Sequence, residues 1–287
     1  MTEIDYAALA REAGLPRVGA RQPLPAYLRE LWDRRHFATK LARYRIEANL
    51  AQNRLGLLWV VLNPLLQSAV YGLVFGVIMP RSTREGENFI PYLVTGFFIF
   101  TYFSQSFNQG ARAITGNTSL VRSLSFPRML LPLSAVIRQI FELVPMMAVL
   151  AVILIGFGEL PSWEWLAVPF VLVLMTMFNF GVALIAARLT VHLRDVTQII
   201  PILTRLLMYL TGIFYSMEQV LADKPEWMMT VAQLNPVHDY ISLIRYALLT
   251  DQPFTQQMVI VSVVAAIVFF FAGIYFFWTA EERYGRD

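Results

Sequence analysis

Long apolar stretches, separated by shorter polar segments, divide this chain into regular units. A helix needs about 20 mostly apolar residues to cross a hydrocarbon core that is roughly 30 Å thick. Six segments qualify as transmembrane helices, and they are residues 55–79, 89–107, 132–157, 163–187, 197–215 and 258–279. The pattern therefore predicts an all-α integral membrane protein, because helices satisfy their own backbone hydrogen bonds in lipid.

The positive charges predict which side of the membrane each end of the chain occupies. With both termini in the cytosol, the inner segments carry 17 of the 23 Lys and Arg residues and the outer segments carry four. Cytosolic segments of membrane proteins are enriched in these residues. Residues 2–53 contain no apolar run of the kind that forms a signal peptide. We therefore expect both termini in the cytosol.

The segment before the first span has two parts. Residues 1–25 contain three prolines and two glycines, which predicts a flexible N-terminal arm. In residues 26–53, apolar and aromatic positions recur at helical spacing, and basic residues lie between them. This pattern predicts an amphipathic helix in the cytosolic membrane interface. It is either a simple juxtamembrane helix or a helix beside a substrate entrance.

The segment after the fifth span is too long and too apolar for an ordinary connection. Asn235 is placed to cap a helix, and Pro236 occupies its first position. That helix would be about 20 Å long, too short to span the membrane. We therefore expect two short re-entrant helices within about 218–250, with Asn235, Pro236 and Arg245 at an outer gate. An amphipathic helix on the outer surface is the alternative.

Two basic residues fall inside the predicted spans. Arg138 and Glu142 are four residues apart, so they can pair on one helix face. Arg205 lies about 13 Å into the fifth span by helix rise, where a cation must face protein or water. Arg205 either faces a transport path or has a structural role, and the sequence leaves both alternatives open.

Aromatic residues are concentrated in the second span and at the end of the fifth. Sugar rings stack their C–H faces on aromatic rings, so such a lining would suit a passing polysaccharide. Aromatic belts at the membrane interface explain the same pattern. The candidate residues of a transport path are Arg205, Tyr71, Phe98, Tyr102, Phe214 and Tyr215.

Several kinds of chemistry are absent from the sequence. The chain has no cysteine, which excludes disulfides, thiolate metal sites and cysteine nucleophiles. Neither Lys40 nor Lys224 lies in a G-x-x-x-x-G-K-[ST] phosphate loop, and the three histidines lie in different segments. We therefore expect no catalytic residue, no metal or cofactor bound by this chain and no nucleic-acid partner. A large membrane protein with no energy source of its own suggests an ATPase partner on the cytosolic side.

Four motifs carry a family resemblance. They are RLGLLWVVLNPLL at 54–66, LVRSLSFPRMLLPLS at 120–134, LTVHLRDVTQIIPIL at 189–203 and LNPVHDYISLIRYALL at 234–249. In this order they resemble the ABC-2-type permeases that export polysaccharides of the O-antigen and teichoic-acid type. The proline-rich arm is similar to the actinobacterial branch, which exports galactan. Thr211 and Gly212 depart from the Ser-Pro pair found in many members.

The resemblance implies a fold and a set of partners. The fold is a six-helix transmembrane domain over residues 54–287, with the interface helix and the re-entrant helices. Two permeases form a homodimer in the bacterial plasma membrane, and two cytosolic ABC ATPase subunits, which bind ATP and Mg, dock beneath them. The cargo is a polysaccharide on a polyprenyl-diphosphate lipid, moved from the cytosolic to the outer face.

The resemblance also implies roles for residues on the cytosolic side. The loop between the second and third spans becomes the ATPase-coupling element, with Arg122, Phe126, Pro127 and Arg128. Arginine binds phosphate oxygens in pairs, so the interface helix is expected to attract the lipid diphosphate through Arg34, Arg35, Lys40 and Arg43.

Two other classes of protein stay open. One is an ABC-2 permease for a drug or a lipid. The other is a membrane enzyme that uses a polyprenyl phosphate, which would need acidic residues at the cytosolic interface. Asp195 is nearly the only candidate there after residue 54.

Overall fold

The computed structural model describes residues 22–52, 56, 58–75, 88–124 and 126–281 of the chain. Every regular element in these ranges is helical, which confirms the all-α prediction for the described part of the chain. The predicted N-terminal arm lies outside the described residues, except for its last four.

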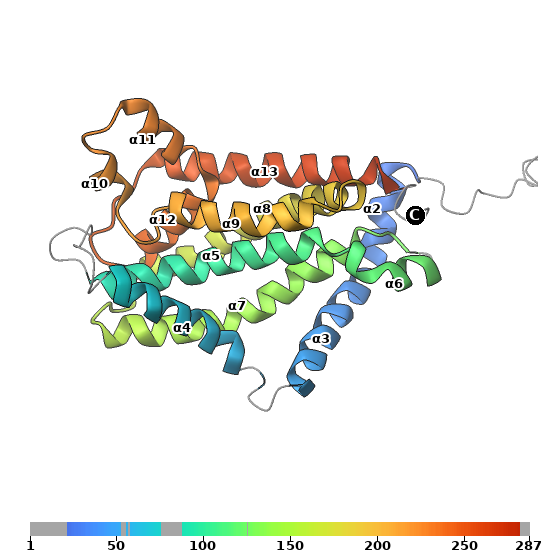
Figure 1. The fold of residues 1–287 in the computed structure, drawn as a ribbon, viewed down its shortest axis with the longest axis horizontal. Helices are drawn as coiled ribbons and strands as arrows, with labels where there is room; N and C mark the ends of the chain where they lie inside the picture. Colours follow the sequence, from blue (N-terminus) through green and yellow to red (C-terminus); the bar gives the residue numbers. More distant parts are fainter. Residues whose placement is uncertain (1–21, 53–55, 57, 76–87, 125, 282–287) are drawn as a thin grey trace, which may run out of the picture.

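Long helices run side by side and form an elongated bundle (Figure 1). They are α4 (Leu58–Leu73), α5 (Phe89–Ala111), α7 (Leu130–Gly156), α8 (Ala167–His192), α9 (Val196–Leu210) and α13 (Gln256–Trp278). Among the described residues, α7, α13 and the segment Trp163–His192 are long and apolar enough to cross a membrane. α4 and α9 are apolar but shorter. α5 has 23 residues, and amide and hydroxyl side chains make its C-terminal half more polar.

The helix predicted over 197–215 is shorter in the structure, where α9 ends at Leu210. Gly212 has a φ of +66°, a left-handed conformation that glycine adopts more readily than residues with a side chain. The chain turns there and continues towards α10 (Met217–Leu221). A helix with the 15 residues of α9 is about 22 Å long, shorter than the hydrocarbon core.

The shorter helices gather towards the two ends of the bundle (Figure 1). α10, α11 (Glu226–Gln233) and α12 (Pro236–Leu248) lie at one end. α2 (Leu24–Asp33) and α6 (Thr118–Ser123) lie at the other end, from which α3 (Arg35–Gln52) runs obliquely across the bundle axis and packs against α7. The 3-10 turns η2 (Thr115–Asn117) and η3 (Trp163–Leu166) precede α6 and α8. The helix predicted over 26–53 is therefore two helices, which meet at Arg34.

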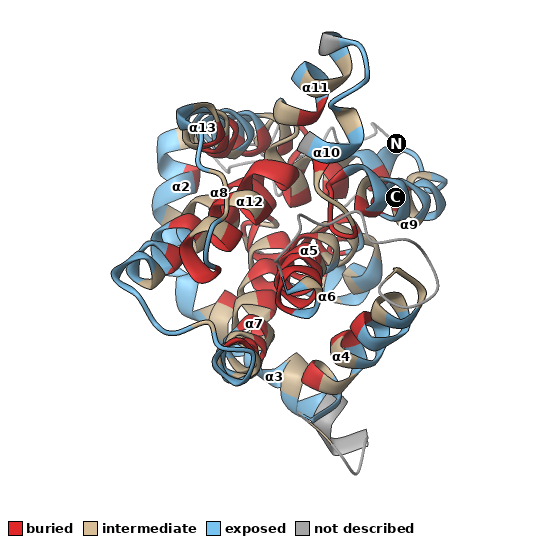
Figure 2. Ribbon diagram, turned by 90° about the vertical axis from the view of Figure 1, so that its left-hand side faces the viewer, coloured by how far each residue is buried: buried red, intermediate tan, exposed pale blue. Residues whose placement is uncertain are grey.

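α5 lies at the centre of the bundle, and 15 of its 23 residues are buried. It packs against α4, α7, α8 and α12, and Figure 2 shows the buried residues concentrated around it. α8 and α13 cross very closely. A Cβ on Gly273 would lie 2.5 Å from the carbonyl oxygen of Gly181, so the crossing depends on small residues.

The outward faces of the long helices are apolar. Exposed large apolar residues occur on all the peripheral helices, among them Leu66, Val152, Phe170, Ile202 and Phe271. Exposed apolar surface on this scale is unfavourable in water, and it is the surface expected of helices that contact lipid or another protein chain.

Candidate functional site

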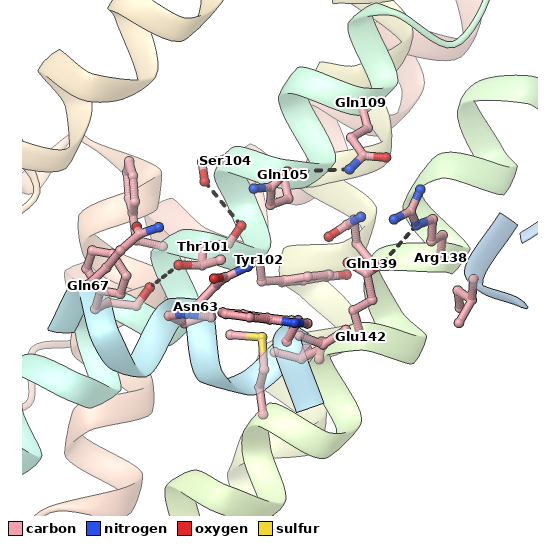
Figure 3. Close-up of a pocket in the computed structure, with 18 of the residues that line it drawn as sticks. Asn63, Gln67, Thr101, Tyr102, Ser104, Gln105, Gln109, Arg138, Gln139 and Glu142 are labelled. Atoms are coloured by element: carbon pink, nitrogen blue, oxygen red, sulfur yellow. Dashed lines mark hydrogen bonds and ion pairs between the residues drawn. The ribbon is translucent and has the colours of Figure 1, made fainter. Parts of the chain in front are cut away.

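A polar pocket lies between α4, α5 and α7, with a volume of about 430 Å³. This is within the range of about 300–1,000 Å³ that is typical of ligand sites. Figure 3 shows polar side chains from the three helices around one space. The polar residues that line it are Asn63, Gln67, Thr101, Tyr102, Ser104, Gln105, Gln109, Arg138, Gln139 and Glu142.

The lining of this polar pocket offers hydrogen-bond donors and acceptors beside aromatic rings. Gln139 is buried, and its Nε2 atom has no hydrogen-bond partner within the described structure. Tyr102 is held in place by a 2.7 Å hydrogen bond between its hydroxyl and that of Thr176. Trp59 and Phe100 add apolar surface. Amides, hydroxyls and rings of this kind suit a ligand that is rich in hydroxyl groups.

The pair predicted in the third span is present beside this polar pocket. Arg138 Nε lies 2.8 Å from the Glu142 carboxylate, and both side chains are largely buried. The pair places a cation and an anion on the same face of α7. The structure therefore confirms the sequence prediction that these two residues pair.

Some of the predicted transport-path residues form an aromatic cluster at the junction of α4, α5 and the end of α9. Tyr71 lies 5.6 Å from Phe97 and 4.8 Å from Phe214, measured between ring centroids. The Tyr215 hydroxyl donates to the carbonyl oxygen of Tyr209 at 2.6 Å. The Phe98 side chain is completely buried in the core. The role of these residues in transport stays a prediction.

Arg205 is exposed on α9, among apolar neighbours that are also exposed. Asn63 and Gln67 are likewise exposed on α4. Polar and charged side chains at this depth must face protein or water. The surface that carries these three residues is therefore unsuited to lipid contact.

Arg245 joins three segments near the end of the bundle where α10–α12 lie. Its buried guanidinium donates to the carbonyl oxygens of Tyr92, Gly212 and Ile213 at 2.9–3.2 Å. It also lies 3.4 Å from the ring centroid of Tyr92. Arg245 therefore holds α12, the first turn of α5 and the turn after α9 together.

The predicted start of α12 is confirmed. The Asn235 side chain accepts a hydrogen bond from the backbone N–H of Val237 at 3.1 Å, and Pro236 is the first residue of the helix. The structure thus gives Asn235 and Pro236 a helix-starting role. Whether this region gates transport stays a prediction.

The predicted coupling element is anchored to the other segments at the end of the bundle that carries α2. The Arg128 backbone N–H donates to the Glu281 carboxylate at 3.0 Å, and the Arg128 guanidinium donates to the Glu281 carbonyl. The Tyr27 hydroxyl donates to the same carboxylate at 3.0 Å. Burial raises the pKa of the Glu281 carboxyl, and the hydrogen bonds from Arg128 and Tyr27 oppose that rise. These contacts join α2, the start of α7 and the end of α13.

The other residues of the predicted coupling element differ in exposure. The Phe126 ring lies 5.3 Å from that of Phe37 on α3, and Pro127 is buried. Arg122 and Leu124 are exposed, on and just after α6. Figure 1 shows α6 projecting at this end of the bundle. The exposed part of the segment is therefore α6, whereas Phe126, Pro127 and Arg128 hold the segment against the rest of the bundle.

The four basic residues predicted at a lipid entrance, Arg34, Arg35, Lys40 and Arg43, are all exposed. Arg34 pairs with Glu30 at 3.0 Å. The Arg35 guanidinium stacks over the ring of Trp32, and that of Arg43 lies over Phe141. Three of the four thus contact different neighbours, and their role at an entrance stays a prediction.

Residues 38–249 match the protein family described as ABC-2 type transporter, which is most of the chain. The chain belongs to this family. It is 28% identical over 210 residues to the O-antigen export system permease protein RfbA of Myxococcus xanthus, covering 73% of this chain and 79% of that protein. It is 27% identical to a protein of the same name from Klebsiella pneumoniae, covering 64% and 70%.

A more distant relative is the capsule polysaccharide export inner-membrane protein CtrC of Neisseria meningitidis, at 24% identity over 66% of this chain and 72% of that protein. The relatives carry the names of polysaccharide export permeases. The resemblance seen in the four sequence motifs is thereby confirmed.

The sequence prediction missed most of the polar pocket of this ABC-2 permease. Thr101, Gln105 and Gln109 recur every four residues on α5, and Asn63 and Gln67 do so on α4. Residues four apart share a helix face, so this spacing was the signal that could have found the pocket. Among the described residues, no group of three or more His, Asp or Glu could hold a metal ion.

Proposed function

We propose that this chain is the permease subunit of an ATP-driven exporter, which moves a polyprenyl-diphosphate-linked polysaccharide from the cytosolic to the outer face of the bacterial plasma membrane. Membership of the ABC-2 family, together with the polysaccharide-export names of its relatives, carries this proposal. The hydroxyl-binding chemistry of the polar pocket supports it. Galactan-type, O-antigen-type and teichoic-acid-type glycans all fit this cargo class.

The proposal assigns the long helices of the bundle to six membrane crossings, by α4, α5, α7, α8, α9 and α13. α2 and α3 then lie in the cytosolic interface, and both termini are cytosolic. α10, α11 and α12 form the re-entrant segment on the outer side. The position of α2 at the opposite end of the bundle from α10–α12 supports this arrangement (Figure 1).

The proposal includes three partners. Two permeases form a homodimer, and two cytosolic ABC ATPase subunits bind ATP and Mg and drive transport. The lipid-linked polysaccharide is the substrate. The exposed residues of α6 provide the ATPase contact, because this helix projects from the end of the bundle that also carries α2.

Controlled depletion of the protein in its native bacterium tests this function. Surface polysaccharide should fall, and a polyprenyl-diphosphate-linked glycan should accumulate on the cytosolic side, as measured by mass spectrometry of extracted lipids. Re-expression of the wild-type chain should reverse both changes. Unchanged surface polysaccharide, with altered efflux of a drug or a lipid, would instead favour the alternative ABC-2 cargo. Transferase activity of the purified chain alone would favour a membrane enzyme.

A further inference from the structure

A second pocket adjoins the polar pocket, and three arginines line it. They are Arg45 on α3, Arg112 just after α5, and Arg138 on α7. The remaining lining residues are amides and small residues, and none of the nine residues described along this pocket is acidic. Gln105, Gln109 and Arg138 line both pockets, so the basic pocket and the polar pocket are neighbours.

The basic pocket has a defined structure, because hydrogen bonds hold one of its arginines in place. Arg45 Nη2 donates a 2.6 Å hydrogen bond to Asn117 Oδ1. The amide of Asn117 donates in turn to the carbonyl oxygen of Ala113 at 2.6 Å, which fixes the orientation of its side chain. Arg45 therefore points from the interface helix towards the end of α5, instead of towards bulk water.

The arrangement keeps two cations close together. Burial lowers the pKa of the Arg45 guanidinium, and repulsion from Arg138 lowers it further. Arg138 contacts Glu142 through Nε, and that carboxylate lines the polar pocket rather than the basic pocket. Like charges held together in this way are unfavourable unless an anion binds between them.

We propose that Arg45, Arg112 and Arg138 form a binding site for a phosphate or diphosphate group. Guanidinium groups bind phosphate oxygens through two parallel hydrogen bonds, and several of them together can hold a diphosphate. The three arginines come from three different elements near the cytosolic end of the bundle, so an anion bound there would also join those elements. If the proposed function holds, the adjoining polar pocket would receive the sugar that is attached to the diphosphate.

The site differs from the four basic residues predicted on the interface helices. Those side chains are exposed, and three of them contact different neighbours. Arg45 lies on the same helix as Arg43, two residues further on, but it is partly buried and lines a pocket. The two sets of arginines can therefore be separated by substitution.

Binding to the purified full-length permease in phosphatidylcholine nanodiscs tests the site, with inorganic pyrophosphate as the probe. The double variant Arg45→Gln with Arg112→Gln should bind pyrophosphate at least about tenfold more weakly than the wild type, because two charge-assisted contacts are lost. Arg29→Gln is the matched control, since Arg29 is an exposed arginine on α2 outside the pocket. It should bind pyrophosphate like the wild type. Arg138 is kept in both proteins, so that Glu142 retains its partner.

A second arm separates a lipid headgroup from a diphosphate. The same proteins are placed in nanodiscs with and without phosphatidylglycerol, and their thermal stability is compared. Stabilisation by phosphatidylglycerol that is lost in the double variant, without pyrophosphate binding, would support the phosphate site and identify its ligand as a lipid headgroup. Equal pyrophosphate binding and equal stabilisation in the double variant and the control would overturn the proposal.

The outcome is independent of the proposed function, because binding is measured without transport. A permease that binds pyrophosphate through Arg45 and Arg112, but whose depletion leaves surface polysaccharide unchanged, would refute polysaccharide export and keep the phosphate site. A permease that exports glycan while the double variant binds pyrophosphate normally would refute the phosphate site alone.

Discussion

At the scale of single residues, Arg245 shows how a buried charge can be structural. Its guanidinium is completely surrounded by protein and contacts three carbonyl oxygens and one ring. Gly96 leaves the space that this requires, because a Cβ on Gly96 would lie 2.2 Å from Arg245 Nη2. Carbonyl groups beyond the end of α9 lack the N–H donors of a continuing helix. The Arg245 guanidinium donates to two of them, those of Gly212 and Ile213.

We expect Arg245→Met to unfold the permease at a lower temperature than the wild type. The substitution removes the Arg245 donors from three buried carbonyl groups, of which Gly212 keeps a hydrogen bond from the Tyr92 hydroxyl; a buried carbonyl left without a donor costs about 1–3 kcal/mol. Arg245→Lys should recover little of the lost thermal stability, because an ammonium group lacks the planar guanidinium geometry that reaches several carbonyls. Thermal unfolding in detergent, followed by intrinsic fluorescence, measures the change. Arg194→Met, at an exposed arginine, is the control. An equal loss of thermal stability in both variants would contradict the role of Arg245 in holding the three segments together.

The helices show what the sequence could and could not predict. The third and sixth predicted spans agree with α7 and α13 to within a few residues, because their apolar runs have polar ends. The end of α9 could not be predicted in this way. It depends on Gly212 and on Arg245, a partner 33 residues away from Gly212 in the sequence.

The site was less predictable than the helices. The Arg138–Glu142 pair and the Asn235 cap are local, so spacing alone predicted them. The polar pocket showed in the sequence only as a four-residue spacing of polar side chains on α4 and α5, whereas the basic pocket depends on which helix faces meet, and a single sequence does not contain that information. The same limit applied to Phe126. The resemblance gave it a role in ATPase coupling, which stays a prediction, and its packing on Phe37 of α3 could not be read from the sequence.

This difference gives a test of the coupling segment at the scale of elements. Arg122→Glu, at an exposed position on α6, should lower association with the ATPase subunits. Phe126→Ala should lower thermal stability by about 1 kcal/mol or more, because it removes partly buried aromatic contacts. Co-purification of the tagged ATPase and thermal unfolding measure the two effects. Arg29→Glu on α2 is the charge control, and equal loss of the ATPase in both charge variants would contradict a specific contact by α6.

At the scale of the whole molecule, one side of the bundle is unlike the others. α4 and α9 carry exposed apolar residues, as the other peripheral helices do, but they also carry Asn63, Gln67 and Arg205 at exposed positions. Figure 2 shows α4 and α9 on the same side of the bundle, away from α13. Met208 of α9 lines the polar pocket together with residues of α4, so the pocket belongs to this side as well. A second copy of the chain against this surface would shield its polar groups from lipid.

The absence of cysteine makes this arrangement directly testable, because one introduced thiol is the only thiol in the chain. Leu66→Cys on α4 and Ile202→Cys on α9 place a thiol on the polar side, at residues that are 51% and 70% exposed. In membranes, a short bismaleimide should convert both variants largely into covalent dimers, as measured by gel electrophoresis without reductant. Phe271→Cys on α13, which is 62% exposed, should stay monomeric because α13 lies away from α4 and α9 (Figure 2). Dimers formed equally by all three variants would reflect random collision, and dimers formed only through α13 would place the partner on the opposite side of the bundle.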